Sequence, residues 1–252
     1  MTYITLSGKQ INYEDLGDGL PLVMIHGSLC RHRLWDQQRA LSKEARLILL
    51  DLPGHGESDP LEGAITIPRF ANIVAQLIHA LGIEWMVPVG HSLGGAIALQ
   101  LALDFPDLLQ GLILIGTGAK LGVLPAILEG LKADFQTGID LTIGHLAFAP
   151  GADPKLVELS KVEFQSCNPD VGYADFVACN QFDIREQVQA IEVPTLVIVG
   201  REDQLTPVKW SKFLADSMPT AELCIIEQAG HLVMLEQPLK VNQVISAFLN
   251  TL

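Results

Sequence analysis

Short runs of apolar residues alternate along the chain with longer segments whose apolar residues recur at helical spacing. Buried strands are predicted at six of the short runs, residues 22–25, 46–50, 85–89, 111–115, 195–199 and 222–226. Helices are predicted at about 68–81, 93–103 and 240–249. Strands that alternate with helices are typical of a mostly parallel sheet covered on both faces, so we expect an α/β fold.

The alternation of strands and helices stops between Gly116 and Val193, where no clear strand is visible and Gly and Pro residues separate several short helical segments. The segment lacks the composition of a linker, and strands resume after it. We therefore expect one domain, with a core formed by residues 1–116 and 193–252 and an inserted helical cap at 117–192. We expect most of an apolar stripe in this cap to pack it onto the core: Leu121, Val123, Leu124, Ile127, Leu128, Leu131 and Phe135.

Pro88 does not fit the strand predicted around it. Proline has no N–H to donate to a neighbouring strand, which makes it rare in a central strand. We expect a bulge or a local distortion of the sheet just before Ser92.

Composition and charge narrow the possible partners of this protein. The chain has 252 residues, 49% of them hydrophobic, and a formal net charge of −13. Nucleic acid and anionic membrane surfaces repel so acidic a protein, so we expect neither as a partner. No stretch of about 18 apolar residues and no secretory pattern is visible. The four cysteines lack the spacing of a zinc site or a disulfide framework, which favours free thiols in the cytoplasm.

The most informative motif is Gly90-His-Ser-Leu-Gly94, which lies between a predicted strand and a predicted helix. In that context G-x-S-x-G indicates a nucleophile elbow, a tight strained turn that raises the serine hydroxyl above the sheet. Side chains at Gly90 and Gly94 would crowd this turn. The following helix N-terminus offers amide donors and a favourable dipole to a developing anion. Ser92 is therefore the expected nucleophile.

Together with this motif, four further segments resemble the α/β-hydrolase superfamily over nearly the full length of the chain. They are His26-Gly27, Asp51-Leu-Pro-Gly-His-Gly-Glu-Ser58, Gly200-Arg-Glu-Asp203 and Gly230-His231. The resemblance implies a doubly wound, mostly parallel sheet with a cap, and a serine esterase-like activity. It also argues against epoxide or carbon–halogen chemistry, because members with those activities carry Asp where Ser92 stands.

A serine hydroxyl needs a base, and the base needs a third group to hold it. His231 follows the last predicted strand, at the sheet edge that carries Ser92, and it comes last in the Ser-Asp-His order of the superfamily. Asp203 lies just beyond the strand at 195–199, where open α/β sheets place their sites. Its neighbour Glu202 is the rival, expected to face solvent, whereas Asp51 is expected to fix its own loop.

The resemblance implies an oxyanion hole built from the backbone N–H groups of Leu93 and Ser28. The mechanism then requires no cofactor and no metal. We expect a small, apolar, ester-like substrate and a monomer or a homodimer. Substrate contacts are expected from residues near these loops and in the cap: His26, Leu29, His91, Leu121, Leu124, Leu205 and Leu232.

Several activities remain open at the level of sequence. Carboxylic ester hydrolysis leads, but the same triad serves thioesters, lactones and carbon–carbon bonds of vinylogous diketones. Cofactor-free lyase or peroxidase chemistry also occurs on such scaffolds, because fold does not fix function. A non-catalytic ligand receptor is disfavoured by the complete set of triad residues.

Overall fold

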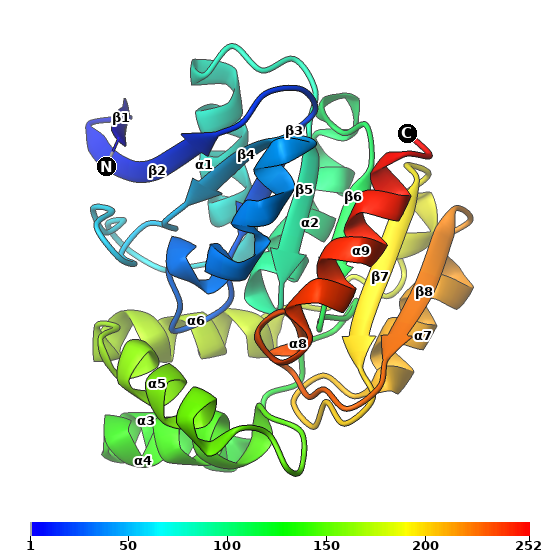
Figure 1. Cartoon of the computed structure of the whole chain (residues 1–252). Coiled ribbons are helices and arrows are strands. Elements are labelled where there is room, and N and C mark those ends of the chain that lie inside the picture. The colour runs from blue at the N-terminus through cyan, green and yellow to red at the C-terminus, as the bar shows by residue number, and fades with distance from the viewer. Residues whose placement is uncertain (1) are drawn as a thin grey trace.

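The computed structural model describes residues 2–252, whose eight strands form one sheet in the order β1-β2-β4-β3-β5-β6-β7-β8 (Figure 1). The strands from β4 across to β8 run parallel, whereas β1 and β2 pair antiparallel at one edge. The strands are β1 Thr2–Leu6, β2 Lys9–Leu16, β3 Pro21–Ile25, β4 Arg46–Leu50, β5 Val87–His91, β6 Leu112–Ile115, β7 Thr195–Gly200 and β8 Ala221–Ile226.

The structure confirms the predicted α/β sheet and corrects it in two places. The strand predicted at 85–89 is β5, which begins two residues later, and Trp85 is 50% exposed before it. The hairpin β1–β2 was not predicted. Its second strand carries Lys9, Glu14 and Asp15 among its apolar residues, because this edge of the sheet is only partly covered.

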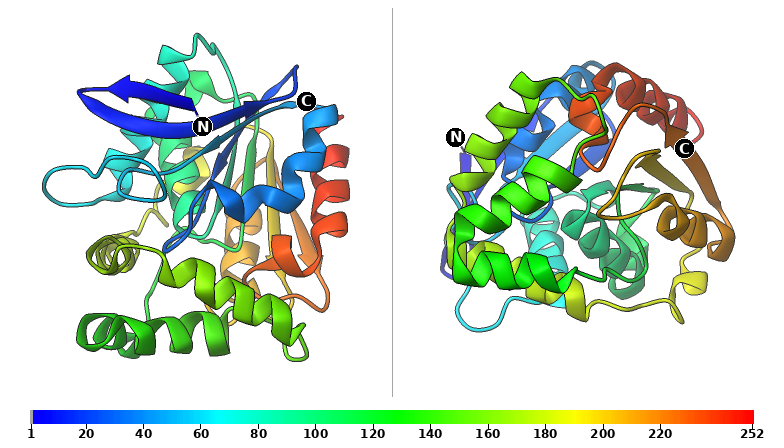
Figure 2. Two further views of the ribbon diagram at one scale, coloured as in Figure 1. Left: turned by 60° about the vertical axis from the view of Figure 1, so that its left-hand side comes forward. Right: turned by 90° about the horizontal axis from the view of Figure 1, so that it is seen from below.

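Helices cover both faces of the sheet (Figures 1 and 2). Helices α1, α2 and α7 pack on one face, and η1 and α9 on the other. The body helices are η1 His32–Lys43, α1 Ile67–Ala80, α2 Leu93–Asp104, η2 Pro106–Leu108, α7 Val208–Ser217, α8 Val233–Glu236 and α9 Pro238–Leu249. Helix α1 begins where the sequence predicts, with Pro68 in its first turn and the Thr66 hydroxyl accepting the N–H of Arg69.

The chain between β6 and β7 forms helices that lie below the carboxyl ends of the parallel strands (Figures 1 and 2). Three of these helices have polar N-caps: Asp134 accepts the N–H of Thr137, Asp153 that of Lys155, and Asn168 that of Asp170. The helices of this insertion are α3 Pro125–Ala133, α4 Phe135–Ile139, η3 Asp140–Leu146, α5 Pro154–Gln165, α6 Pro169–Gln181 and η4 Val188–Ala190. They leave the carboxyl edge of the sheet enclosed between the body and the insertion.

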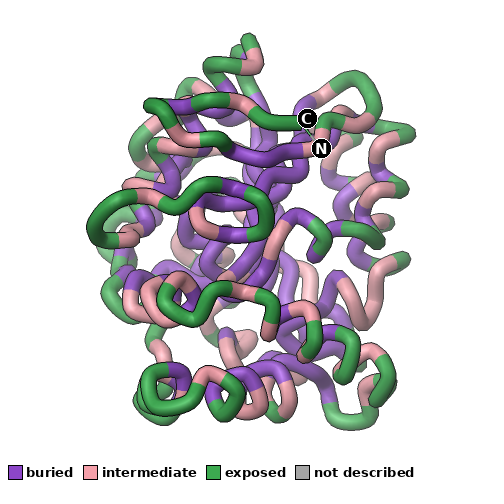
Figure 3. The backbone as a smooth tube through the Cα atoms, turned by 90° about the vertical axis from the view of Figure 1, so that its left-hand side faces the viewer, coloured by how far each residue is buried: buried purple, intermediate pink, exposed green. Residues whose placement is uncertain are grey.

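The central strands lie in the core, buried on both faces (Figure 3). Strands β3, β6 and β7 are buried at every position, which explains why they appear in the sequence as unbroken apolar runs. Among residues 2–252 the longest helix, α1, has 14 residues, and none of the helices could span a bilayer.

The distortion expected at Pro88 is present on the β6 side of β5. Met86 faces Leu109, whereas Val89 faces Ile113, so the β6 side gains one residue between these two pairs. On its other side β5 keeps a regular register, in which Pro88 faces Val23. The missing N–H of the proline therefore falls at a bulge-like break in the ladder, three residues before His91.

Candidate active site

Ser92 lies between β5 and α2 on a strained turn, with φ 53° and ψ −115°. Positive φ is unfavourable for a residue with a β-carbon and persists only where surrounding contacts impose it. The Ser92 N–H donates to the carbonyl of Ile115 at 3.0 Å, and the Ser92 carbonyl accepts the hydroxyl of Thr117 at 2.9 Å. Strand β6 and the residues after it therefore hold the turn in place.

The two glycines of the motif are required by close backbone contacts. A β-carbon at Gly90 would lie 2.2 Å from the carbonyl oxygen of Gly94, and one at Gly94 would lie 2.1 Å from that of Ile25. No side chain fits at such distances. The crowding predicted from the motif thus arises from the helix start and from β3.

Asp203 and His231 form a buried hydrogen-bonded pair at the same sheet edge. Asp203 follows β7 and His231 follows β8, and His231 Nδ1 lies 2.9 Å from Asp203 Oδ2. The other carboxylate oxygen accepts the N–H groups of Leu205 and Thr206, at 2.9 and 2.7 Å. Because the carboxylate accepts from Nδ1–H, the unprotonated Nε2 is left to accept a proton.

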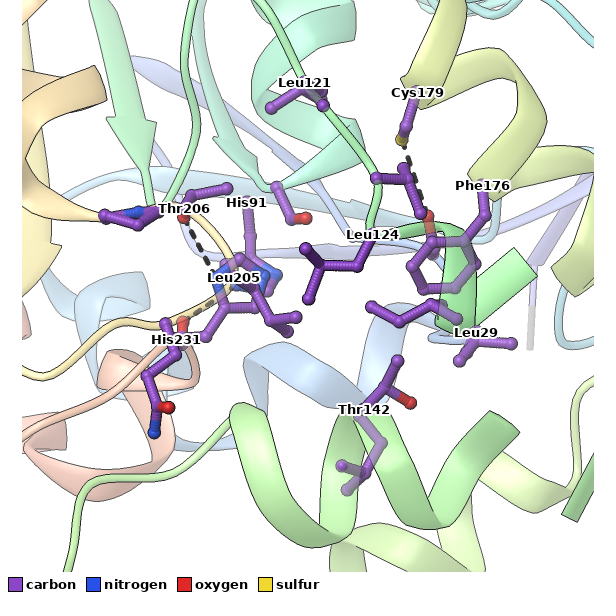
Figure 4. Close-up of a pocket in the computed structure, with 18 of the residues that line it drawn as sticks. Leu29, His91, Leu121, Leu124, Thr142, Phe176, Cys179, Leu205, Thr206 and His231 are labelled. Carbon is purple, nitrogen blue, oxygen red and sulfur yellow. Dashed lines mark hydrogen bonds between the residues drawn. The ribbon is translucent and has the colours of Figure 1, made fainter. Parts of the chain in front are cut away.

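Thr206 contacts both members of this pair. Its hydroxyl donates to Asp203 Oδ2 at 2.7 Å and lies 3.1 Å from His231 Nδ1 (Figure 4). Sequence reasoning missed this residue. The available signal was its position three residues after Asp203, since hydroxyl residues at such spacing often bond within a turn.

The loop that carries His231 is fixed by the inserted segment. The carbonyl of Ala147 accepts the N–H groups of His231 and Leu232, at 2.8 and 3.2 Å. The Glu236 carboxylate accepts the N–H groups of Ala149 and Gly230, at 2.9 and 2.6 Å. Burial raises the pKa of Glu236, although both backbone donors oppose this shift. The position of His231 therefore depends on the insertion.

The sequence suggested that Glu202 faces solvent, but the residue is half-buried and its side chain is hydrogen-bonded. Its carboxylate accepts the N–H of Ala229 at 3.0 Å, and its own N–H donates to the Ala229 carbonyl at 3.0 Å. These bonds join the loop after β7 to the loop before His231. The Glu202 side chain thus holds the backbone before His231, and the His231 imidazole is hydrogen-bonded to Asp203 instead.

His91, the residue before the nucleophile, contacts the backbone and the ring of His231. Its Nε2 lies 3.1 Å from the carbonyl oxygen of His231, and the two rings lie 4.6 Å apart at 53°. Burial, and then the neighbouring His231, lower the pKa of His91 well below its usual value. The neutral ring therefore donates Nε2–H to the backbone of His231.

His26 lies outside the cavity that contains Ser92, contrary to the substrate contact expected for it. The fully buried ring accepts the N–H of Leu52 at 3.0 Å and donates to the carbonyl of Gly27 at 2.8 Å. Burial, followed by the nearby His55, lowers the pKa of His26 to about 3. The neutral ring fixes the loop that leads from β3 to Ser28.

Asp51 fixes its loop, as the sequence suggested. The buried carboxylate accepts from His32 twice, through the backbone N–H at 2.7 Å and through Nδ1 at 2.8 Å. It also accepts the side-chain amide of Asn12 and the N–H of Glu57, at 2.8 and 3.0 Å. Each oxygen of the Asp51 carboxylate thus already accepts two hydrogen bonds from nearby residues, so Asp51 is unavailable to His231.

Ser92 and His231 border one cavity of about 200 Å³ between the body and the insertion. Figure 4 shows His91, Leu205 and Thr206 beside His231 at one end and Phe176 and Cys179 at the other. Lys209 is the one lysine, arginine, aspartate or glutamate among its described lining residues. Of the lining residues, Leu29, His91, Leu121, Leu124, Leu205 and Leu232 were expected as substrate contacts and Ser28 as an oxyanion donor; those missed include Gly122, Thr142, Ile143, Phe164, Phe176, Cys179, Gln204, Thr206, Pro207, Lys209 and Trp210.

The apolar stripe of the insertion divides between two roles. Leu121, Val123, Leu124 and Ile127 line the cavity. Such contact was expected for Leu121 and Leu124, whereas the expectation of packing alone is wrong for Val123 and Ile127. Leu131 is buried and packs within the insertion, where a β-carbon on Gly138 would touch it.

The backbone donors expected at the oxyanion hole belong to Leu93, directly after Ser92, and to Ser28, directly after Gly27. Leu93 is the first residue of α2, and N–H groups of a first helical turn have no acceptor within their own helix. Ser28 follows β3 and lines the cavity, and its hydroxyl lies 3.8 Å from the sulfur of Cys179. Both amides thus follow a parallel strand at the carboxyl edge of the sheet, Ser28 after β3 and Leu93 after β5.

Comparison with known proteins agrees with this architecture. A family model described as alpha/beta hydrolase fold matches residues 21–238. The chain is 31% identical to a 2-hydroxymuconate semialdehyde hydrolase of Pseudomonas sp. (strain CF600), over 98% of this chain and 92% of that protein. It is also 31% identical to a pimeloyl-[acyl-carrier protein] methyl ester esterase of Vibrio atlanticus (strain LGP32), over 85% and 88%.

Solved structures show the same relationship. The structure of a thermophilic esterase superposes with a TM-score of 0.89 at 36% sequence identity, covering 99% of this chain and 97% of that one. The family model spans most of the chain, and the relatives match nearly all of it. The chain therefore belongs to the alpha/beta hydrolase fold family and is a hydrolase.

Proposed function

We propose that this hydrolase cleaves carboxylic esters of small, apolar substrates through an acyl-enzyme on Ser92. The observation that carries the proposal is the buried Asp203–His231 pair, which borders the same cavity as Ser92. Three residues far apart in sequence follow three parallel strands to one edge of the sheet. Such convergence is what nucleophilic catalysis by serine requires.

In the proposed mechanism His231 Nε2 takes the proton of the Ser92 hydroxyl as its oxygen attacks the ester carbonyl. Asp203 stabilises the imidazolium that results, and the N–H groups of Ser28 and Leu93 donate to the oxyanion. His231 then protonates the leaving alcohol. Water, deprotonated by the same imidazole, releases the acid and restores Ser92.

The lining of the cavity supports the substrate class. Most of its side chains are aliphatic or aromatic, and a lysine at position 209 is the one strongly charged group among those described. An apolar cavity favours an uncharged ester, since an unpaired ionic group would lose its hydration there. A small acyl or alkyl group suits a cavity of about 200 Å³.

The proposal treats residues 117–192 as a cap over a core formed by 1–116 and 193–252. Residues of this segment supply about half of the cavity wall and hold the His231 loop through Ala147 and Ala149. We further propose a cytoplasmic monomer or homodimer. The four cysteines are all free thiols, which suits a reducing compartment.

A panel of p-nitrophenyl esters from acetate to decanoate tests the activity. The wild type should turn over the shorter esters, and Ser92→Ala should abolish that turnover while keeping the thermal melting temperature. Equal rates for the two proteins would refute acyl-enzyme chemistry at Ser92. Turnover by neither protein would refute the ester assignment.

A second candidate is hydrolysis of a carbon–carbon bond, favoured by the 31% identity to a semialdehyde hydrolase over 98% of the chain. The same nucleophile, base and oxyanion donors would serve it. A vinylogous diketone assayed beside the esters separates the two activities. Faster Ser92-dependent cleavage of the diketone would favour this candidate over the esterase.

A further inference from the structure

The cavity at Ser92 has a neighbour with which it shares one lining residue, Phe164. Phe164, on α5, lines the active-site cavity and also lines a second cavity of about 220 Å³. Two adjacent residues also line the two cavities, Leu29 the first and Cys30 the second. They therefore lie back to back, and the buried Phe164 ring stands between them.

The ring is held there by an ion pair at the adjacent position. Two guanidinium nitrogens of Arg31, Nε and Nη2, donate to the Glu163 carboxylate, the latter at 2.8 Å. Arg31 belongs to the body and Glu163 to α5, so the pair fixes this part of the insertion against the body. A bidentate pair also fixes direction, which sets the orientation of the next residue on the helix.

The second cavity suits the far end of an apolar chain. Its inner wall is formed by Leu34, Leu235 and Phe164, whereas Arg33 and Asp36 lie at its exposed rim. Arg31 is neutralised by Glu163, so the lining offers no unpaired buried charge to reject a hydrocarbon. A chain reaching this space from Ser92 would bury methylene groups against leucine side chains.

We propose that Phe164 is a specificity-determining residue: its ring closes the active-site cavity and limits the length of the acyl or alkyl chain that the enzyme accepts. Removing the ring would join the two cavities into one tunnel. This inference rests on the proposed esterase function. It assigns the second cavity to the distal part of long-chain esters, a substrate class that the wild type should disfavour.

The test compares chain-length preference in variants of two cavity-lining phenylalanines. Phe164→Ala should open the second cavity, whereas the matched control Phe176→Ala enlarges only the first, because Phe176 does not line the second. The readout is the ratio of kcat/KM for a long ester to that for a short one, from which the active fraction cancels. One series varies the acyl chain of p-nitrophenyl esters, and another varies the alcohol of alkyl acetates.

Each methylene that becomes buried in the transition state should raise the ratio by about fourfold. We expect Phe164→Ala to raise it by tenfold or more in one of the two series, and Phe176→Ala to raise it by much less, because the latter enlarges only the first cavity. Phe164→Leu, which keeps an apolar side chain in the core, should give a smaller rise and serves if the alanine variant does not fold.

An unchanged ratio in both Phe164 variants would overturn the inference, as would an equal rise in Phe176→Ala. Either result leaves the esterase function intact, because wild-type turnover of short esters and its loss in Ser92→Ala are measured in the same plates. Absence of that Ser92-dependent turnover would instead overturn the proposed function, and this inference with it.

Discussion

Replacing Asp203 by Asn tests how the base is held, with almost no change in shape. The Asn side-chain carbonyl can still accept the N–H groups of Leu205 and Thr206, which bind Oδ1 in the wild type. The amide nitrogen then takes the place of Oδ2, where the wild-type carboxylate accepts from Thr206 and His231. An amide donor at this position faces two donors instead of satisfying them.

The imidazole has one way to relieve this conflict, which is to accept from the amide through Nδ1. Its proton then sits on Nε2, so His231 no longer offers a lone pair to the Ser92 hydroxyl. A wrong tautomer of this kind lowers kcat by about 10⁴-fold in serine hydrolases, or about 5.4 kcal/mol of transition-state stabilisation. We expect a loss of that order in kcat/KM at pH 7.

The assay is steady-state hydrolysis of p-nitrophenyl acetate by the wild type, Asp203→Asn and the control Glu202→Gln. Glu202 is the adjacent carboxylate but bonds the Ala229 N–H, so Glu202→Gln should lose less than tenfold. Circular dichroism and melting temperature establish that each variant is folded. Folded Asp203→Asn with activity within tenfold of the wild type would mean that another group holds His231, and the proposed triad would be wrong.

Three further changes probe the surroundings of the site. Thr206→Val removes the hydroxyl donated to Asp203 and should reduce kcat/KM by tenfold or more, from a lost bond of about 1.5–3 kcal/mol to a charged group; an unchanged rate would contradict this. Glu236→Gln leaves one of two backbone N–H groups without an acceptor, so the free energy of unfolding should fall by about 1–3 kcal/mol in a denaturant titration. His55 and Asp175 form a buried pair at 2.8 Å. Burial opposes the charged ring, but the carboxylate outweighs it and raises the pKa of His55, so the folded protein holds a proton that the unfolded chain releases near pH 6.5. The stabilisation should be complete below that pH and disappear as pH rises through the raised pKa; Asp175→Asn should abolish this dependence, and a stability difference that persists at high pH would refute it.

The parts of the fold that the sequence predicts are those whose burial is uniform. Strands β3, β4 and β7 appear as apolar runs because parallel strands are covered on both faces. The hairpin β1–β2 lies at the sheet edge, where charged residues interrupt the pattern, and it was missed. Helix α7 was missed as well, although its buried Leu214 packs on the sheet.

The residues of the candidate site likewise include some that the sequence predicts and some that it does not. Ser92, Asp203 and His231 could be predicted because each follows a strand in a short motif, and parallel strands bring their carboxyl ends to one edge. Glu236 and Phe164 could not, because their roles arise from contacts between segments about 90 and 130 residues apart in sequence. Glu202 was expected to face solvent, and only the fold reveals that its carboxylate accepts the N–H of Ala229.

The central claim is that the Ser92 hydroxyl is an activated nucleophile. Intact-protein mass spectrometry after treatment with a fluorophosphonate tests it most directly, with peptide mapping of the modified residue. A single adduct on Ser92, absent from Ser92→Ala and strongly slowed in His231→Ala, is the predicted result. An adduct on another residue, or no adduct on a folded protein, would contradict the account.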